Sequence, residues 1–309
     1  MLDHYDVVIV GGGVAGLTAG LFATRYGLRT LLLERDIPGG QIVNVERIEN
    51  FPGFPQGLAG AELGPLIQEH ASQWGLEIRL GEAMGLRLEE PYRALRTTEG
   101  EVRAKAVVIA GGSSLRRLGI PGEEELAGKG VSHCATCDGP FFAGEVVGVV
   151  GGGDSALDEA LTLTQYARRV LLFVRGERMR AQKVLQERAL KEPKIEVRTH
   201  TVVTAIEGEG QVQAVKIKDT RNGATSRVPV AGMFIYVGLD PNTAWLKGVI
   251  PLDNAGHIPV DVWMQTPVPG VFAAGDIRQH SAAQLVTAAG DGATAAIAAY
   301  RYVTSRGWP

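Results

Sequence analysis

The chain has 309 residues, 45% of them hydrophobic, which is ample for a buried core and for one or two domains. The formal net charge is −3 and the basic residues form no long run, which argues against nucleic acid as a partner. No apolar stretch is long enough to span a membrane and the start lacks the positive segment of a secretion signal, so we expect a cytoplasmic protein that does not enter a membrane.

The first predicted unit covers residues 6–36, "DVVIVGGGVAGLTAGLFATRYGLRTLLLERD". It contains an apolar strand, a glycine-rich turn, a helix and a second apolar strand, which is the pattern of a dinucleotide-binding βαβ unit. Gly11 would make the tight turn, Gly13 would let the backbone approach a pyrophosphate, and Gly16 would let helix and strand pack closely. Glu34 ends the second strand, where a carboxylate accepts hydrogen bonds from a ribose 2′-hydroxyl, as FAD or NAD requires.

A second copy of this pattern begins 140 residues later, in "EVVGVVGGGDSALDEALTLTQYARRVLLFVRGE". Gly151 and Gly153 repeat the first two glycines, and Ala156 takes the third position. The position equivalent to Glu34 is Val174, and Arg175 follows it. Because arginine binds a 2′-phosphate and a carboxylate would repel it, this site favours NADP. Two such sites predict a flavin paired with a nicotinamide nucleotide.

Both cysteines of the chain lie between the two units, in "CATCDG". Cys134 and Cys137 are three apart, so on one turn of helix both sulfurs face the same side. A structural disulfide closing so short a loop would contribute only roughly 2 kcal/mol, and a zinc site lacks further ligands, so we expect no metal. A redox-active pair is favoured over both, and over two inert thiols. Asp138 follows as a candidate proton donor or an ordinary turn residue.

The rest of the sequence repeats the same order of elements after each unit. Residues 76–95 and 195–218 have the pattern of β meanders, and each is followed by an apolar strand. We therefore predict an α/β fold with two Rossmann-like βαβ domains, each with a small antiparallel β meander, the second inserted into the first. The Gly- and Pro-containing segments "GSSLRRLGIPGEEE" and "YVGLDPNTAWL" are the expected linkers. They give domains of 1–114, 115–243 and 244–309.

Six motifs, in this order, resemble those of the low-molecular-weight thioredoxin reductases: "GGGVAG", "PGGQ" at 38–41, "ENFPGF" at 49–54, "CATCDG", "GGGDSA" and "VFAAGD" at 271–276. The resemblance covers the whole chain. It implies a homodimeric flavoprotein that binds FAD through the first and last parts of the chain and NADPH through the middle domain. It also implies that Cys137 lies against the flavin, that Cys134 attacks thioredoxin or a thioredoxin-like protein, and that Asp138 supplies the proton.

The resemblance also gives the expected cofactor residues. Asp276 would hold a ribitol hydroxyl of FAD, and a helix from about Ala282 would aim its N-terminus at the flavin. Asn50 would line the flavin ring or only cap "FPGF". The expected FAD site comprises Gly11, Gly13, Ala15, Gly16, Glu34, Arg35, Gly40, Gln41, Asn50, Gly275, Asp276, Gln284 and Leu285. The expected NADP site comprises Gly151, Gly153, Asp154, Ser155, Arg175 and Arg180.

The sequence departs from the family pattern at three places. "VRGERMRA" replaces a signature of His-Arg-Arg followed by Arg-Ala, so that Val174 and Gly176 stand where a His and an Arg are usual. Ala283 replaces the Arg before Gln284, and Gly111 replaces a Thr. These departures keep other functions open: a reductase that takes electrons from NADH or ferredoxin, a flavin dithiol oxidase acting on small-molecule thiols, or a flavin-bound redox sensor without turnover.

Overall fold

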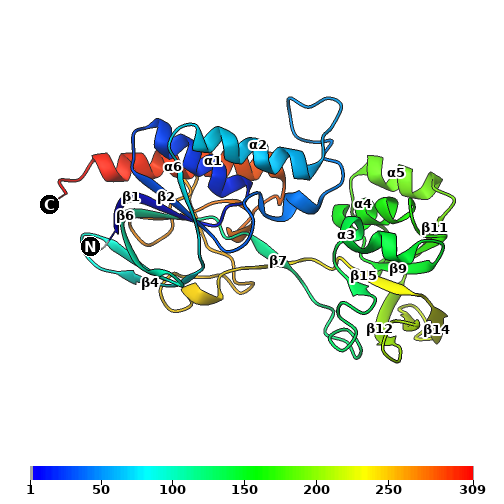
Figure 1. Cartoon of the computed structure of the whole chain (residues 1–309). Coiled ribbons are helices and arrows are strands. Elements are labelled where there is room, and N and C mark those ends of the chain that lie inside the picture. Colours follow the sequence, from blue (N-terminus) through cyan, green and yellow to red (C-terminus); the bar gives the residue numbers. More distant parts are fainter. Residues whose placement is uncertain (1–2, 309) are drawn as a thin grey trace. The chain divides into compact units, whose positions relative to one another are not determined.

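The computed structural model describes residues 3–308 and divides into two compact units (Figure 1). One unit comprises the residues up to Ser114 and those from Asp240 onward, and the other comprises Leu115–Leu239. Two short strands, β7 (Ser113–Leu115) and β16 (Leu239–Pro241), carry the chain between the units and pair with each other. The second unit is therefore inserted into the first.

The second linker ends earlier than the boundary at 243 that the sequence suggested. Asn242 donates its backbone N–H to the carbonyl of Gly112, and the Thr243 hydroxyl donates to the carbonyl of Gly256 at 2.6 Å. Both partners belong to the first unit. These contacts assign Asn242 and Thr243 to the first unit, which resumes at Asp240.

The first unit is built on one sheet with strand order β3-β2-β1-β6-β5-β4, and β17 pairs with β6. Pairs among β1, β2, β3, β6 and β17 are parallel, whereas β4 and β5 are antiparallel to their neighbours. The strands are β1 (Asp3–Val10), β2 (Thr30–Glu34), β3 (Glu77–Leu80), β4 (Ala83–Leu88), β5 (Arg93–Thr97), β6 (Gly100–Ile109) and β17 (Val271–Ala273). The central strands β1 and β6 end in apolar, buried runs at residues 7–10 and 106–109, because both faces of the sheet are covered there.

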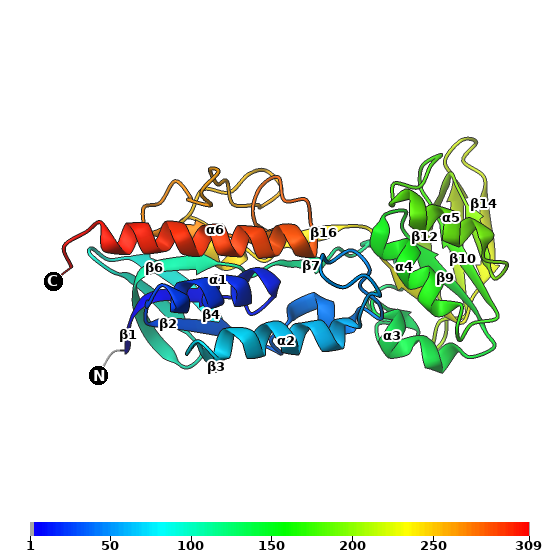
Figure 2. The same ribbon diagram turned by 90° about the horizontal axis from the view of Figure 1, so that it is seen from above.

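Three helices cover one face of this sheet: α1 (Val14–Arg25), α2 (Gly60–Ser72) and α6 (Leu285–Thr304) (Figure 2). Small residues such as Ala19 and Ala295 are fully buried between α1 and α6, so the two helices approach closely. The opposite face packs against the 3₁₀ helix η3 (Ala244–Leu246) through Leu246, and against the segment that follows η3 through Ile250 and Ile258. Further 3₁₀ turns are η1 (Gly40–Asn44) and η4 (Gly275–Ile277).

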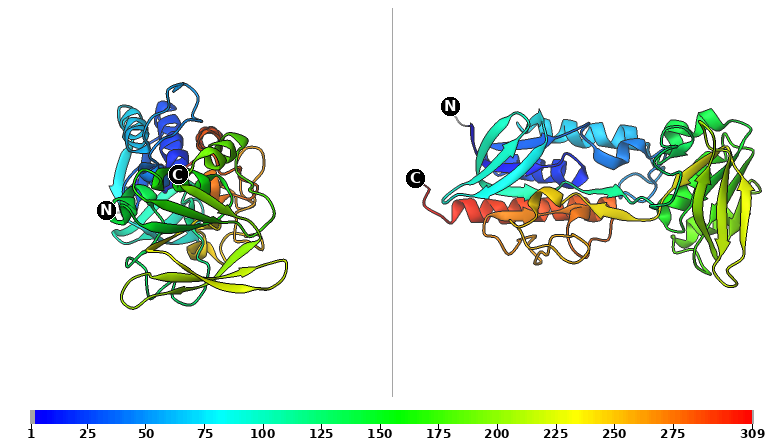
Figure 3. Two further views of the ribbon diagram at one scale, coloured as in Figure 1. Left: turned by 90° about the vertical axis from the view of Figure 1, so that its right-hand side faces the viewer. Right: turned by 90° about the horizontal axis from the view of Figure 1, so that it is seen from below.

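The second unit has a parallel sheet of order β11-β10-β9-β15-β8. One face carries α4, α5 and the short α3, and the other packs against a three-stranded antiparallel sheet, drawn in yellow-green in Figure 3. The strands are β8 (Val131–Ser132), β9 (Val146–Val150), β10 (Arg169–Phe173), β11 (Ile195–Arg198), β12 (Thr201–Glu207), β13 (Ala214–Asp219), β14 (Thr225–Pro229) and β15 (Gly232–Ile235). The helices are α3 (Ala135–Asp138), η2 (Gly139–Phe142), α4 (Asp154–Leu163) and α5 (Lys183–Lys191).

This architecture confirms the predicted α/β fold with two Rossmann-like sheets and an antiparallel meander in each unit. The start of each meander was wrong. β3 and β11 pair in parallel with β2 and β10, so they are outer strands of the Rossmann sheets. The meanders proper are β4–β6 and β12–β14. A run of short apolar strands has the same residue pattern in both arrangements, and only the crossover helices α2 and α5 decide the pairing.

Candidate active site

The first glycine-rich loop gives each of its glycines a different task. Gly11 has φ +104, and a Cβ there would meet the carbonyl oxygen of Ala110 at 2.4 Å. A Cβ on Gly16 would lie 1.8 Å from the carbonyl oxygen of Gly11, so helix α1 packs directly on the loop. A Cβ on Gly13, by contrast, would meet no atom of the described residues within 4 Å. Gly13 precedes α1, so it leaves open the N-terminus of the helix, where a pyrophosphate binds favourably.

Glu34 lies at the end of β2 and is buried, with 8% of its surface exposed. Its carboxylate accepts the backbone N–H of Gly12 at 2.5 Å and that of Asp36 at 2.8 Å, one on each oxygen. It therefore ties the glycine loop to the next turn. Each carboxylate oxygen keeps a further lone pair, which a ribose hydroxyl can use. The neighbouring Arg35 is exposed and pairs with Asp36.

Segments from both ends of the chain meet at the other side of this loop. Gly40 packs against Gly13, because a Cβ on Gly40 would lie 3.1 Å from the Cα of Gly13. The Gln41 side-chain amide donates to the carbonyl of Ser113. The Asn50 side-chain amide donates to the side-chain oxygen of Gln284 at 3.2 Å, across 234 residues of sequence.

The strand β17 brings Gly275 and Asp276 to the same loop. Gly275 has φ +79, and a Cβ there would lie 3.0 Å from the Cβ of Ala15 on α1. Asp276 accepts a hydrogen bond from the Ser281 hydroxyl at 3.3 Å. Burial is the main cause that raises the pKa of Asp276, and the nearby Asp291 adds to it. The structure thus gathers the expected FAD residues on the first unit.

The helix that follows begins later than expected. α6 starts at Leu285, with Gln284 in extended conformation before it, and not near Ala282. Ala283 has φ +51, in the left-handed region, which a right-handed helix cannot include. Gln284 and Leu285 are therefore the residues presented at the N-terminus of this 20-residue helix.

The second glycine-rich loop repeats this geometry within the second unit. Gly151 has φ +148, and a Cβ there would meet the carbonyl oxygen of Tyr236 at 2.3 Å. A Cβ on Gly153 would meet no atom of residues 3–308 within 4 Å. Asp154 opens α4 and accepts the backbone N–H of Gln182 at 2.7 Å and its side-chain amide at 2.8 Å. The other expected NADP residues are exposed: Ser155, Arg175 and Arg180.

The two cysteines form a disulfide at the start of α3, in the same unit as the second glycine loop. Cys134 precedes the helix in extended conformation and is half-buried, whereas Cys137 is exposed. The Cys137 backbone N–H donates to Cys134 Sγ at 3.1 Å. Asp138 ends the helix one residue after the exposed sulfur.

An acidic residue that the sequence did not single out lies beneath this helix. Glu159 on α4 accepts the backbone N–H of Ala135 at 2.7 Å, which joins the nucleotide-loop helix to the cysteine turn. Tyr236 is buried beside it, and its pKa is raised, first by burial and then by the charges of Glu159 and Asp138. Glu159 was missed because its partner is a backbone group 24 residues away.

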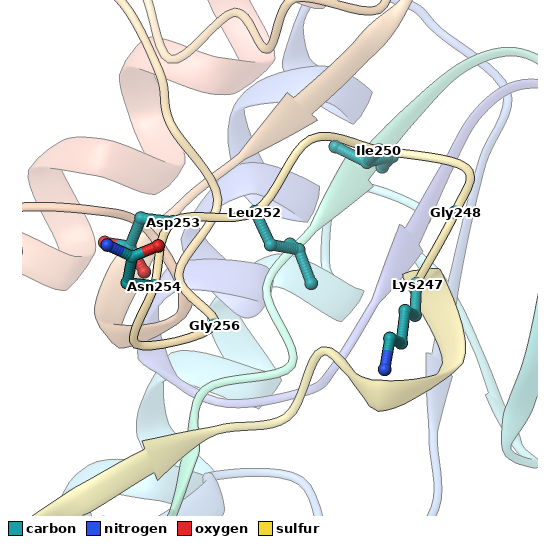
Figure 4. A pocket seen from close by; sticks show the side chains of 7 residues that line it. All are labelled: Lys247, Gly248, Ile250, Leu252, Asp253, Asn254 and Gly256. Atoms are coloured by element: carbon teal, nitrogen blue, oxygen red, sulfur yellow. The ribbon is translucent and has the colours of Figure 1, made fainter.

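A solvent-open pocket of about 390 Å³ lies elsewhere on the first unit, after η3 (Figure 4). None of the expected site residues lines this pocket. Its lining residues are Lys247, Gly248, Ile250, Leu252, Asp253, Asn254 and Gly256. Within residues 3–308 no cluster of three or more His, Cys, Asp or Glu side chains is arranged to hold a metal ion. No helix in that range has the length and apolar character needed to cross a membrane.

Comparisons with known proteins identify the class to which this site belongs. The family model for pyridine nucleotide-disulphide oxidoreductases matches residues 5–292, so the chain belongs to that family. It is an oxidoreductase, and the family implies a flavin together with a nicotinamide nucleotide.

Within this family the chain is similar to thioredoxin reductases, which confirms the resemblance seen in the motifs. It is 43% identical over 300 residues to the thioredoxin reductase of Listeria innocua, covering 97% of this chain and 94% of that protein. The enzyme of Bacillus subtilis is 42% identical, with 97% and 95% covered. The crystal structure of Lactococcus lactis thioredoxin reductase matches with a TM-score of 0.96 at 42% identity, covering 98% of this chain and 100% of that one.

Proposed function

We propose that the chain is a thioredoxin reductase that carries electrons from NADPH, by way of FAD and the Cys134–Cys137 disulfide, to the disulfide of thioredoxin or a thioredoxin-like protein. The observation that carries this proposal is the disulfide at the exposed turn of α3, in the unit that also holds the second glycine loop. The similarity to named thioredoxin reductases over nearly the whole chain supports it.

The residues of the first unit fit FAD. The open side of Gly13 admits a pyrophosphate, Glu34 offers a buried carboxylate to a ribose, and Asp276 offers one to the ribitol chain. Gly40, Gln41, Asn50 and Gln284 would line the flavin ring. When bound, FAD supplies a two-electron acceptor that takes a hydride from the nicotinamide. The N-terminus of α6 favours negative charge in front of it.

The cysteine pair then performs a balanced exchange. Two electrons and two protons convert the Cys134–Cys137 disulfide to two thiols, and we assign to Asp138 the transfer of one of these protons. The Cys134 thiol gives up its proton and the resulting thiolate attacks the disulfide of the partner, so that a mixed disulfide forms and one partner sulfur leaves as a thiolate, which takes up that proton. Cys137 next loses its proton and attacks the sulfur of Cys134, which releases the second partner sulfur as a thiolate that takes up this proton, and the Cys134–Cys137 disulfide closes again.

The nucleotide preference gives a direct test of the second site. Arg175 and Arg180 offer two cations to a 2′-phosphate, so we expect kcat/KM for NADPH to exceed that for NADH. Arg175→Ala should lower this ratio about tenfold, the effect of one charge-assisted hydrogen bond. Steady-state rates with both nucleotides measure it.

The matched control for this variant is Arg169→Ala. Arg169 begins strand β10, whereas Arg175 follows the other end of that strand; Arg169 pairs with Glu196, so its removal should leave the ratio unchanged. A wild-type ratio at or below one would refute the NADPH assignment and favour NADH. Reduction by ferredoxin alone would favour the ferredoxin-dependent alternative.

Two further assignments complete the proposal. We infer a homodimer, so the protein should sediment at twice its mass of 32.9 kDa. The cytoplasmic setting that the sequence analysis expects stays a prediction. A flavin dithiol oxidase is the second candidate function, favoured by the altered arginine signature at Val174 and Gly176. It predicts rapid reoxidation of the reduced protein by air and slow reduction by NADPH or NADH, the reverse of what a reductase shows.

A further inference from the structure

A buried ion pair lies directly behind the loop that carries Asp276. Asp291, on α6, has a side chain that is 9% exposed, and Arg278, in the loop after η4, has one that is 15% exposed. The guanidinium binds the carboxylate with two nitrogens: Nε donates to Oδ2 at 2.6 Å and Nη2 donates to Oδ1 at 3.0 Å. The backbone N–H of Gly275 donates to the same Oδ2 at 3.1 Å.

The remaining nitrogen of Arg278 holds the loop itself. Nη1 donates to the backbone carbonyls of Gln279 at 3.1 Å and His280 at 3.2 Å. One planar guanidinium therefore binds the helix carboxylate and the loop backbone at the same time. Lysine, with a single point of charge, could not reproduce this fork.

The loop from Gly275 to Gln284 needs such a restraint. His280 has φ +59 and Ala283 has φ +51, and both residues carry a side chain in the left-handed region, which costs free energy. The Ser281 hydroxyl accepts the Ala283 N–H and donates to Asp276, so the strained backbone is linked to the candidate ribitol ligand. The loop ends at Gln284, whose side-chain oxygen accepts the hydrogen bond from the Asn50 side-chain amide.

We propose that Arg278 and Asp291 are positioning residues of the flavin site, whose ion pair holds the loop 275–284 so that Asp276 and Gln284 face FAD. The inference rests on the proposed function, because it assumes that FAD binds to this loop. The pair also sets the local charge. With Arg278 present, the negative charge of Asp291 is balanced. A reduced flavin that gains negative charge would then face the carboxylate of Asp276 without an uncompensated Asp291 behind it.

The test compares FAD affinity and flavin reduction potential in three variants. Arg278→Met should weaken FAD binding about tenfold or more, as is common when a supporting residue of a cofactor site is lost. Arg278→Lys, which keeps the charge but not the fork, should recover part of the affinity. The potential of bound FAD should fall in Arg278→Met and rise in Asp291→Asn, because the two changes remove charges of opposite sign. A role confined to folding would not move the potential in opposite directions.

Arg301→Met is the matched control, because Arg301 lies on α6 like Asp291, is exposed and stacks over Trp263 at 4.2 Å. An FAD dissociation constant for Arg278→Met within twofold of this control overturns the inference. So does an unchanged potential in both charge variants. If Arg278→Met does not fold, Arg278→Lys and Asp291→Asn decide by the same two measurements. Failure of the wild-type protein to bind FAD would instead reject the proposed function.

Discussion

We expect Cys137→Ser to abolish turnover with thioredoxin but to leave reduction of the flavin by NADPH intact. The serine cannot form the Cys134–Cys137 disulfide, so electrons that reach the flavin have no sulfur pair to enter. We expect kcat for disulfide reduction to fall at least about 10³-fold, as when a covalent nucleophile is removed. Steady-state assays give the loss, and anaerobic mixing with NADPH gives the retained half-reaction.

Cys134→Ser provides the matched control, because it breaks the same disulfide but removes the other sulfur. In Cys137→Ser, the remaining Cys134 should form a mixed disulfide with thioredoxin that persists, since no second thiol is present to resolve it. In Cys134→Ser no such adduct should accumulate. Non-reducing electrophoresis separates the two results. An adduct in Cys134→Ser alone would reverse the proposed roles of the two sulfurs.

Gly13 in the first loop and Gly16 at the start of α1 should respond to alanine in different ways. Gly16→Ala places a Cβ 1.8 Å from a backbone oxygen, so we expect a loss of roughly 1–3 kcal/mol or more in stability and loss of FAD with it. Gly13→Ala places its Cβ in a region clear of the described atoms, with an ordinary φ of −70. The apoprotein should therefore melt at the wild-type temperature, while FAD affinity falls about tenfold because the methyl group blocks a phosphate hydrogen bond.

Gly153→Ala in the second loop is the control for Gly13→Ala. Its Cβ likewise meets no described atom within 4 Å, so the variant should keep its FAD and its stability while its KM for NADPH rises. Thermal melting of the apoproteins and flavin fluorescence titration measure both effects. If Gly13→Ala bound FAD with wild-type affinity, the assignment of the pyrophosphate to this loop would be wrong.

The parts of the site that follow from local chemistry could be predicted from the sequence. A tight turn with positive φ demands glycine at Gly11, and two sulfurs three residues apart define Cys134 and Cys137 as a pair. These requirements act within a few residues, so spacing alone is sufficient to recognise them. The repeat of the first βαβ unit 140 residues later was recognised in the same way.

The parts of the site that depend on contacts between residues far apart in the sequence could not be predicted from it. Arg278 meets Asp291 13 residues away, and Arg93, which is 1% exposed, donates to the carbonyl of Pro269, 176 residues away. The one available signal for Asp291 was its isolation, as a single charge among the small residues of "VTAAGDGATAAIAA". The late start of α6 depended on the positive φ of Ala283, for which alanine gives no sequence signal.

The most direct test of the proposed electron route is a titration of the FAD-loaded wild-type protein with NADPH in the absence of oxygen. One equivalent should bleach the visible absorbance of the flavin only in part or only briefly, while the Cys134–Cys137 disulfide opens and both cysteines of the chain become reactive towards a thiol reagent. A flavin that stays fully bleached while both sulfurs remain unreactive, or a polypeptide that cannot be loaded with FAD at all, would contradict the account.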